Sequence, residues 1–296
     1  MKKTIQRFFF AIFAFFAVIS LLTSCSTTND APASNTTAET RKEQTELHAA
    51  MKSIKFFFKP MGRPAAYDWL ASHNELGQTF DEYLDSNSTL PTRERNNIYV
   101  LPLGAFTPEQ KKIIDVTVGY LGAFYDLHVE QVPPRPFTAV NPNVRYNNYM
   151  HSRQIKTGYI LNDVLLKILS TDAAALIAFT ADDLYPDETM NYVFGQASME
   201  NRVGVWSLFR HGEHTNYDNF LKRTLKIAVH ETGQMFSMHH CKKYECVMSG
   251  TNPLGETDSR PIDACSECMA KVCWLSDISP KVHYESSSPT AGKMEW

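Results

Sequence analysis

Residues 230–241, HETGQMFSMHHC, predict both the fold and the chemistry of this chain. They complete an apolar-periodic stretch, 220–236, whose hydrophobic positions recur at helical spacing. Asp218 or Asn219 is the expected N-cap. The inward stripe of this predicted helix consists of Leu221, Leu225, Ala228 and Met235.

Two polar side chains share one face of this predicted helix. His230 and Gln234 are four residues apart, so their side chains can converge on one point. Glu231 is next to them and could touch a water held at that point. A turn after Ser237 would bring His240 back toward the helix.

Four of the six cysteines are spaced like metal ligands: Cys241, Cys246, Cys265 and Cys268. Two disulfides are the alternative in an oxidising compartment, because Cys241 can pair with Cys246 and Cys265 with Cys268. Cys273 lies eight residues past Cys265 and so leaves the helical face of the last pair. We interpret it as a buried or free thiol and not as a ligand.

The segment 230–240 resembles the metzincin metallopeptidase signature HExxHxxGxxH, here written HExxQxxSxxH. Together with the cysteines that follow, it is similar to one metzincin family, the archaemetzincins. The resemblance covers about 97–268 and leaves 26–90 outside. Upstream it is carried by the segments IYVLPLG (98–104), YVFGQA (192–197) and RVGVWS (202–207).

The resemblance implies an α/β fold: a mixed, mostly parallel twisted sheet with packed helices, an active-site helix and a C-terminal subdomain containing the Met-turn and the cysteines. It implies that His230 and His240 ligate a catalytic zinc, with Gln234 at the second-ligand position. Glu231 would be the general base, and Met248 the Met-turn residue below the metal. A second, structural zinc would be held by Cys241, Cys246, Cys265 and Cys268.

Two positions depart from the family pattern. Gln234 replaces a histidine, and its neutral amide oxygen is a poor match to zinc, so affinity should fall. Ser237 replaces a glycine that would favour a left-handed turn. A serine in that conformation costs about 1 kcal/mol, or the turn changes its shape.

Other polar residues have competing interpretations. His239 is one residue out of register and is expected to be an exposed polar residue. The acids at 182–183 could orient other groups or form an ordinary turn at the end of a strand. The loop before the active helix is expected to be solvated, or to supply a substitute ligand from His211, Glu213 or His214.

Strands and helices alternate along the body, which predicts right-handed crossovers and a largely parallel sheet with a mixed edge. The helix that begins at Thr107 and Pro108 has a capping box completed by Gln110. A helical segment is expected within 64–86 and another near 160–169. The predicted strands are 97–103, 127–132, 174–179, 192–194 and 202–209.

The N-terminus is typical of a bacterial lipoprotein signal. Basic residues precede an apolar run, 8–22, that is short for a membrane span. LTSC, residues 22–25, resembles a lipobox, in which Cys25 would be lipidated and become the first residue of the mature chain. An uncleaved anchor helix is the alternative.

Five segments are expected. They are a signal peptide (1–24), a flexible tether (25–50), a helical extension (51–96), the archaemetzincin-like domain (97–284) and a loose tail (285–296). The tether is rich in Ser, Thr, Ala and Asn and should bury too little to order itself. The domain would then lie outside the cytoplasm, attached by lipid to a bacterial membrane.

The composition is that of an ordinary globular protein, 43% hydrophobic and 21% charged, and a formal charge of −3 gives no signature of nucleic-acid binding. We therefore predict a membrane-tethered zinc peptidase acting on peptides or proteins. A degenerate member with a weak or lost catalytic zinc, which binds peptides or a partner, is the second hypothesis. A metal-binding lipoprotein without peptidase activity is the third.

Overall fold

The computed structural model describes residues 34–86, 89–212 and 215–278. Cys25, the apolar run before it and the tail at 285–296 lie outside these ranges. The chain divides into two compact units, 1–44 and 45–296. None of the described helices has the length and apolar character needed to cross a bilayer.

Helix α2 (Ser34–Ile54) carries the boundary between the units. Over 34–50, the part of the predicted tether that the structure describes, this helix differs from the unordered segment that was expected. The stretch from Ala38 onward is rich in Ala, Glu, Lys, Arg and Gln, which are strong helix formers. Helix propensity, together with the packing of Leu47 and Met51 against the main hydrophobic core, accounts for the order that the composition argument overlooked.

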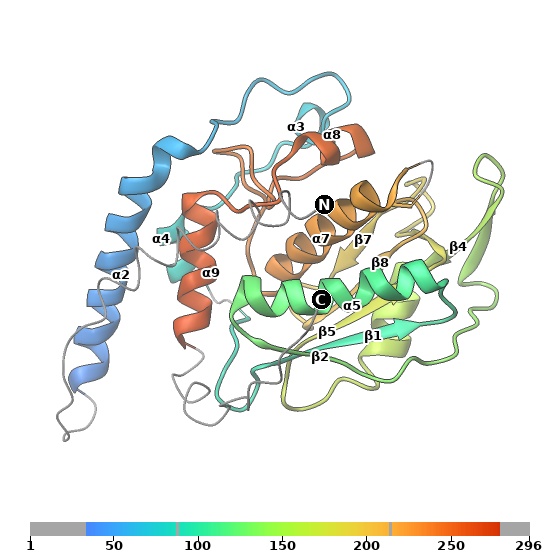
Figure 1. The fold of residues 1–296 in the computed structure, drawn as a ribbon, viewed down its shortest axis with the longest axis horizontal. Coiled ribbons are helices and arrows are strands. Elements are labelled where there is room, and N and C mark those ends of the chain that lie inside the picture. The colour runs from blue at the N-terminus through green and yellow to red at the C-terminus, as the bar shows by residue number, and fades with distance from the viewer. Residues whose placement is uncertain (1–33, 87–88, 213–214, 279–296) are drawn as a thin grey trace, which may run out of the picture. The chain divides into compact units, whose positions relative to one another are not determined.

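A five-stranded sheet forms the centre of the second unit, in the order β2-β1-β5-β8-β7 (Figure 1). Four strands run parallel, and β7 pairs antiparallel with β8 at the edge. The predicted mixed, mostly parallel sheet is thus confirmed. Its strands are β1 (Asn97–Leu103), β2 (His128–Gln131), β5 (Ala173–Thr180), β7 (Gly195–Ala197) and β8 (Val203–Ser207).

Helices α5 (Pro108–Tyr125) and α7 (Tyr217–Met235) pack against each other and against one face of this sheet (Figure 1). The predicted capping box is present at the start of α5, where Thr107 and Gln110 exchange hydrogen bonds. The other face is covered by α6 (Thr157–Tyr159) and the π-helical turn η2 (Ile160–Leu165), where a regular helix was expected.

The remaining elements surround this core. A second sheet, β3-β4-β6, was not predicted from the sequence; it consists of β3 (Val144–Asn147), β4 (Ser152–Lys156) and β6 (Asp183–Tyr185). The helical segment expected within 64–86 is two short helices, α3 (Trp69–Ser72) and α4 (Phe80–Asp85), which follow the turn η1 (Lys55–Phe57). The described chain ends with α8 (Leu254–Ser259) and α9 (Ser266–Ile278).

The strand expected at 192–194 lies three residues later, at β7. The aromatic residues in 192–194 suggested a strand there. The strand begins instead at the next residue, Gly195, because of the close packing at that position. A Cβ atom on Gly195 would lie 2.9 Å from the Cβ of Trp206 and 3.3 Å from the Cγ of Glu231. Only glycine lets the edge strand approach both β8 and the active helix this closely.

Candidate active site

Helix α7 carries the predicted active-site residues. It begins at Tyr217, three residues earlier than the sequence suggested, and its N-cap is Asn216 instead of Asp218 or Asn219. The Asn216 side chain accepts a hydrogen bond from the backbone N–H of Asn219, as N-cap residues do. The extra turn lengthens the helix without changing which of its faces turns toward the sheet.

The structure brings the two predicted histidines together. The ring centroids of His230 and His240 are 4.9 Å apart. His240 reaches this position because Ser237 adopts a left-handed conformation, with φ of 63°. The turn that the family's glycine would favour is therefore kept with serine, whose Oγ accepts a hydrogen bond from the backbone N–H of Thr89 at 3.0 Å.

Each imidazole is held by its Nδ1 atom. Nδ1–H of His230 donates to the carbonyl oxygen of Val247 at 3.0 Å. Nδ1–H of His240 donates to the carboxylate of Glu75, with distances of 2.8 and 2.9 Å. Both Nε2 atoms are thereby left as lone-pair donors, because the other ring nitrogen carries the proton. Burial lowers the pKa of His230 to about 3, with His240 as the second cause.

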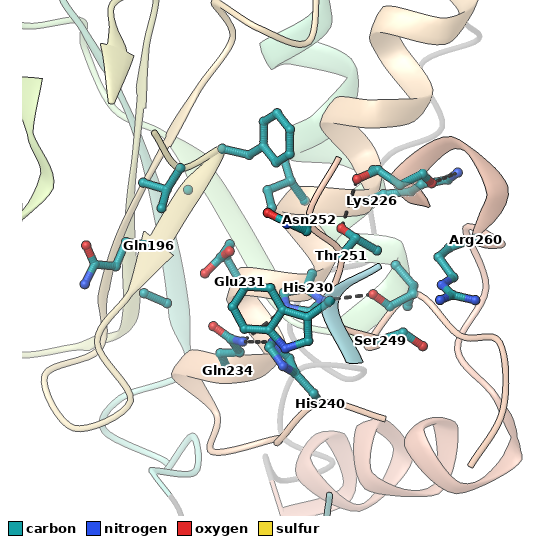
Figure 2. A pocket seen from close by; sticks show the side chains of 18 of the residues that line it. Gln196, Lys226, His230, Glu231, Gln234, His240, Ser249, Thr251, Asn252 and Arg260 are labelled. Carbon is teal, nitrogen blue, oxygen red and sulfur yellow. Dashed lines mark hydrogen bonds between the residues drawn. The ribbon is translucent and has the colours of Figure 1, made fainter. Parts of the chain in front are cut away.

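The amide of Gln234 lies between these two lone pairs (Figure 2). Its Nε2 is 3.1 Å from Nε2 of His230 and 2.8 Å from Nε2 of His240. The three predicted ligand side chains therefore meet at one point, as the spacing suggested. In this arrangement the amide N–H groups donate to both imidazoles.

Glu231 lies beside this point and is buried. Its Oε2 has no hydrogen-bond partner within the described residues. Burial raises the pKa of Glu231 to about 8, partly offset by a hydrogen bond from the backbone of Ala197. A buried carboxyl group with an unpaired oxygen is suited to holding a water or exchanging a proton with it.

Met248 packs against α7 at Gly233, in the position below the site that was expected for the Met-turn residue. It is buried, and a Cβ atom on Gly233 would lie 2.8 Å from its thioether. The absence of a side chain at Gly233 thus lets α7 approach the segment that carries Met248. That segment also positions Val247, the partner of His230.

The four predicted metal-binding cysteines cluster in the structure. Their Sγ atoms lie within 4.8 Å of one another, all four residues are buried, and each is a free thiol. Sγ of Cys246 accepts hydrogen bonds from the backbone N–H groups of Met248 and Cys265. The set matches the closed, four-thiolate donor arrangement of a structural zinc site. Burial raises the pKa of Cys246, so a cation would be needed to stabilise four thiolates.

The other candidates lie away from the convergence point. Cys273 is outside the cysteine cluster, and the His239 side chain is exposed. His211 is fully buried and does not line the active-site cavity, while 213–214 lie outside the described residues. Asp183 belongs to β6 and binds the guanidinium of Arg210 at 2.8 and 2.7 Å, so it is an orienting group and not a simple turn residue.

Residues from the N-terminal extension complete the site, and no sequence motif marks them. Trp69 lines the cavity, and its indole Nε1–H donates to Oε1 of Glu75 at 2.9 Å. Gln78 accepts a hydrogen bond from the backbone N–H of His239 and donates to the carbonyl of Ser237. Both ends of the turn are thus tied to a segment that the family signature does not include.

The convergence point opens into a cavity of about 210 Å³. One wall is β7 and the segment before it, and the opposite wall is the chain after the Met-turn (Figure 2). The polar and charged residues that line it are Gln196, Lys226, His230, Glu231, Gln234, His240, Ser249, Thr251, Asn252, Thr257 and Arg260.

The fold and this site define a metallopeptidase of the metzincin type. The model of peptidase family M54 matches residues 145–273. Human archaemetzincin-2 is 30% identical over 265 residues, which are 78% of this chain and 73% of the relative. An archaemetzincin of Methanocaldococcus jannaschii is 30% identical over 128 residues, 42% of this chain and 71% of the relative. The chain belongs to the archaemetzincin family of zinc metallopeptidases.

A solved structure supports the fold independently. The crystal structure of archaemetzincin from Methanopyrus kandleri superposes with a TM-score of 0.52 at 22% identity. The match covers 63% of this chain and 98% of that chain. The shared fold therefore extends over nearly all of the archaeal protein, and this chain has additional residues.

Proposed function

We propose that this chain hydrolyses peptide bonds with a zinc ion bound by His230 and His240. The observation that carries the proposal is the convergence of both Nε2 lone pairs on one point, with the unpaired carboxylate oxygen of Glu231 beside it. Membership of a zinc metallopeptidase family supports the same function.

The donor set fits zinc. Neutral imidazoles are preferred zinc ligands. The Nδ1–H group of each one makes a hydrogen bond that fixes the ring, as is usual for metal-binding histidines. Turning the Gln234 amide by 180° would place its carbonyl oxygen, and not its nitrogen, between the imidazoles. When bound, zinc would lower the pKa of a water and polarise the substrate carbonyl.

The chain's own residues supply the remaining steps. A cation bound at the imidazoles would favour the ionised form of Glu231, against the effect of burial. In that form Glu231 would accept the proton of the attacking water and pass it to the leaving amine. Strand β7 is a sheet edge that lines the cavity, so an extended peptide could add to it as a further strand. This pairing would hold the peptide carbonyl near the imidazoles.

A second, structural zinc on Cys241, Cys246, Cys265 and Cys268 belongs to the same proposal. The four thiols are buried at the junction of the Met-turn segment and α9. Lys271 on α9 is buried and electrostatically coupled to these thiols, so its ammonium would offset part of the charge of a four-thiolate site.

One observation favours a second candidate, a peptide-binding protein without catalytic zinc. The Gln234 amide donates hydrogen bonds to Nε2 of both imidazoles. Both nitrogens therefore have a partner even without a metal ion. Zinc stoichiometry separates the candidates: two ions per chain support the peptidase, and one ion, held by the cysteines, supports the binding protein.

Hydrolysis gives the functional test. A set of unstructured peptides should be cleaved by the zinc-loaded wild type and not by Glu231→Ala, which retains both imidazoles. Equal cleavage by both proteins would contradict the assignment of Glu231 as the base.

Attachment to a bacterial membrane through lipid on Cys25 is also part of the proposal. Its support is the basic, apolar and LTSC sequence at the N-terminus. Phe56 and Phe57 are also 82% and 84% exposed and lie among lysines, as suits a surface close to anionic lipid. Cys25→Ala should block lipid attachment and processing; processing and membrane binding like the wild type would contradict the anchor.

A further inference from the structure

One end of the active-site cavity carries positive charge. Lys226 lies on α7 four residues before His230, so about 6 Å of helix rise separates them. Both residues line the cavity. Nζ of Lys226 donates to two backbone carbonyl oxygens, of Thr257 at 2.8 Å and of Asp258 at 3.3 Å. An ammonium has three N–H donors, so one is left for a ligand.

Arg260 lies at the same end of the cavity (Figure 2). Its η2 nitrogen donates to Oε1 of Glu256 at 2.8 Å. Its Nε is buried and has no acceptor within the described residues. Since buried donors are nearly always paired, this one indicates a place for an acceptor that the chain itself does not supply.

The charges near this end do not cancel. Glu256 pairs with Arg260, and Asp258 pairs with Arg223. Lys226 has no carboxylate partner within the described part of the chain; its acceptors are carbonyl groups. Among the described residues, Glu231 is the one acid that lines the cavity, and it lies at the catalytic end.

We propose that the Lys226–Arg260 end binds a carboxylate of the substrate. The ligand would be an acidic side chain next to the scissile bond, or the terminal carboxylate of a short peptide. One turn of helix between Lys226 and His230 matches the reach of a glutamate side chain whose backbone carbonyl lies at the imidazoles. The proposal rests on the proposed peptidase function, and it names the substrate class.

The surroundings would strengthen such an ion pair. The Arg260 side chain is 11% exposed, and Lys226 is partly buried. This burial lowers the pKa of Lys226. A charge-assisted hydrogen bond in such a place is stronger than at an open surface. The hydroxyl groups of Thr251 and Thr257 complete a polar wall.

Paired peptides test the proposal. In a series of alanine-based hexapeptides, blocked at both ends, one Glu is moved through the positions, and each peptide has a Gln counterpart. The zinc-loaded wild type should cleave one Glu peptide at least about tenfold faster, in kcat/KM, than its Gln counterpart. Free and amidated C-termini, compared separately, identify a terminal carboxylate as the ligand.

Variants at position 226 test whether Lys226 is the source of this selectivity. Lys226→Gln should bring the Glu-to-Gln ratio close to one, and Lys226→Arg should largely retain it. Lys222→Gln is the matched control, because Lys222 is exposed on the same helix and does not line the cavity. A ratio that Lys226→Gln leaves unchanged, or a wild type without preference for either carboxylate, would overturn the proposal.

Binding separates this proposal from the peptidase function. Calorimetric Kd values for the paired peptides, measured on Glu231→Ala, should show the same preference of about tenfold. If no peptide is cleaved but the Glu peptides bind more tightly, the peptidase function fails and the carboxylate site stands. If no peptide binds, or all bind equally, the carboxylate site fails.

Discussion

Glu75 accepts a hydrogen bond from Nδ1–H of His240, although 165 residues separate them in sequence. The same carboxylate accepts from the indole of Trp69, whose backbone N–H donates to Glu256. The segment before β1 therefore orients one of the two imidazoles of the site. A carboxylate behind a metal-binding histidine fixes its tautomer and raises its basicity.

Removal of this carboxylate should weaken zinc binding at the catalytic site. For Glu75→Ala we expect a loss of affinity of about 10- to 100-fold, since partners behind metal ligands contribute this much. Glu75→Gln should lose less, because its amide oxygen can still accept from Nδ1–H. Competition with a chromophoric chelator measures both. Asp85→Asn is the control, an exposed acid in α4; an equal loss there would mean that the effect is not specific.

Replacing Gln234 by histidine should raise zinc affinity. Position 234 is one turn from His230 on the same helix face, so an imidazole there reaches the convergence point without backbone movement. It would complete three protein ligands and leave a place for water. We expect tighter zinc retention in chelator competition and faster peptide hydrolysis, and Glu231→Ala should abolish hydrolysis in both backgrounds.

Two outcomes distinguish the candidate functions in this experiment. If wild type holds one zinc and Gln234→His holds two, the natural protein lacks the catalytic ion and the binding-protein candidate is favoured. If the variant retains zinc no better than wild type, position 234 is not the second-ligand position.

Local signals were enough to predict the central part of the molecule. The spacing of His230 and Gln234, the turn at Ser237 and the capping box of α5 involve residues at most ten apart, so their geometry follows from helix and turn rules. The order of strands and helices likewise predicted the parallel sheet, because crossover connections have a preferred hand.

The parts that could not be predicted depend on distant contacts. Glu75 and Trp69 lie in a segment with no recognisable motif, and only the folded chain brings them to His240. The β3-β4-β6 sheet has short strands of mixed burial, which give no clear alternation. The position of β7 was missed because the decisive contact, Gly195 against Trp206, joins two strands.

The cysteine cluster should be a zinc site and not two disulfides. Alkylation under denaturing conditions, without reductant, should find Cys241, Cys246, Cys265 and Cys268 free. A strong chelator should lower Tm markedly, because the binding energy of a structural zinc is also folding energy. Cys265→Ala should abolish this effect of the chelator, whereas Cys273→Ala, outside the cluster, should retain it. Two disulfides found by mass would contradict the site.

Two substitutions at Ser237 separate the effects of backbone strain and of hydrogen bonding on the stability of the left-handed turn. Ser237→Ala keeps the positive φ and loses the bond from Thr89, so it should destabilise by about 1 kcal/mol. Ser237→Gly loses the same bond but removes about 1 kcal/mol of left-handed strain. Urea unfolding should therefore place the glycine variant about 1 kcal/mol above the alanine variant. Equal stability of the two would show that the turn relaxes.

His211 should make the fold sensitive to mild acid. Its side chain is fully buried, and neither ring nitrogen has a hydrogen-bond partner within the described residues. Burial lowers its pKa to about 3, with a smaller lowering by Arg223 and an opposing effect of Asp258. The imidazole is therefore neutral in the folded chain at pH values where it would be protonated after unfolding.

The sign of the effect follows from this difference. As pH falls through 6.5 toward 3, the unfolded chain binds a proton that the folded chain excludes, so stability falls by up to about 1.4 kcal/mol per pH unit. His211→Leu should lose this contribution, and its free energy of unfolding, measured with urea at pH 7.5 and 4.5, should change less than that of wild type. His128→Leu, at an exposed histidine, should keep the wild-type slope, because the other carboxylates and imidazoles that titrate in this pH range are common to both variants. If the free energy of unfolding of His211→Leu depended on pH as strongly as that of wild type, His211 would have to bind a proton in the folded protein as readily as in the unfolded chain.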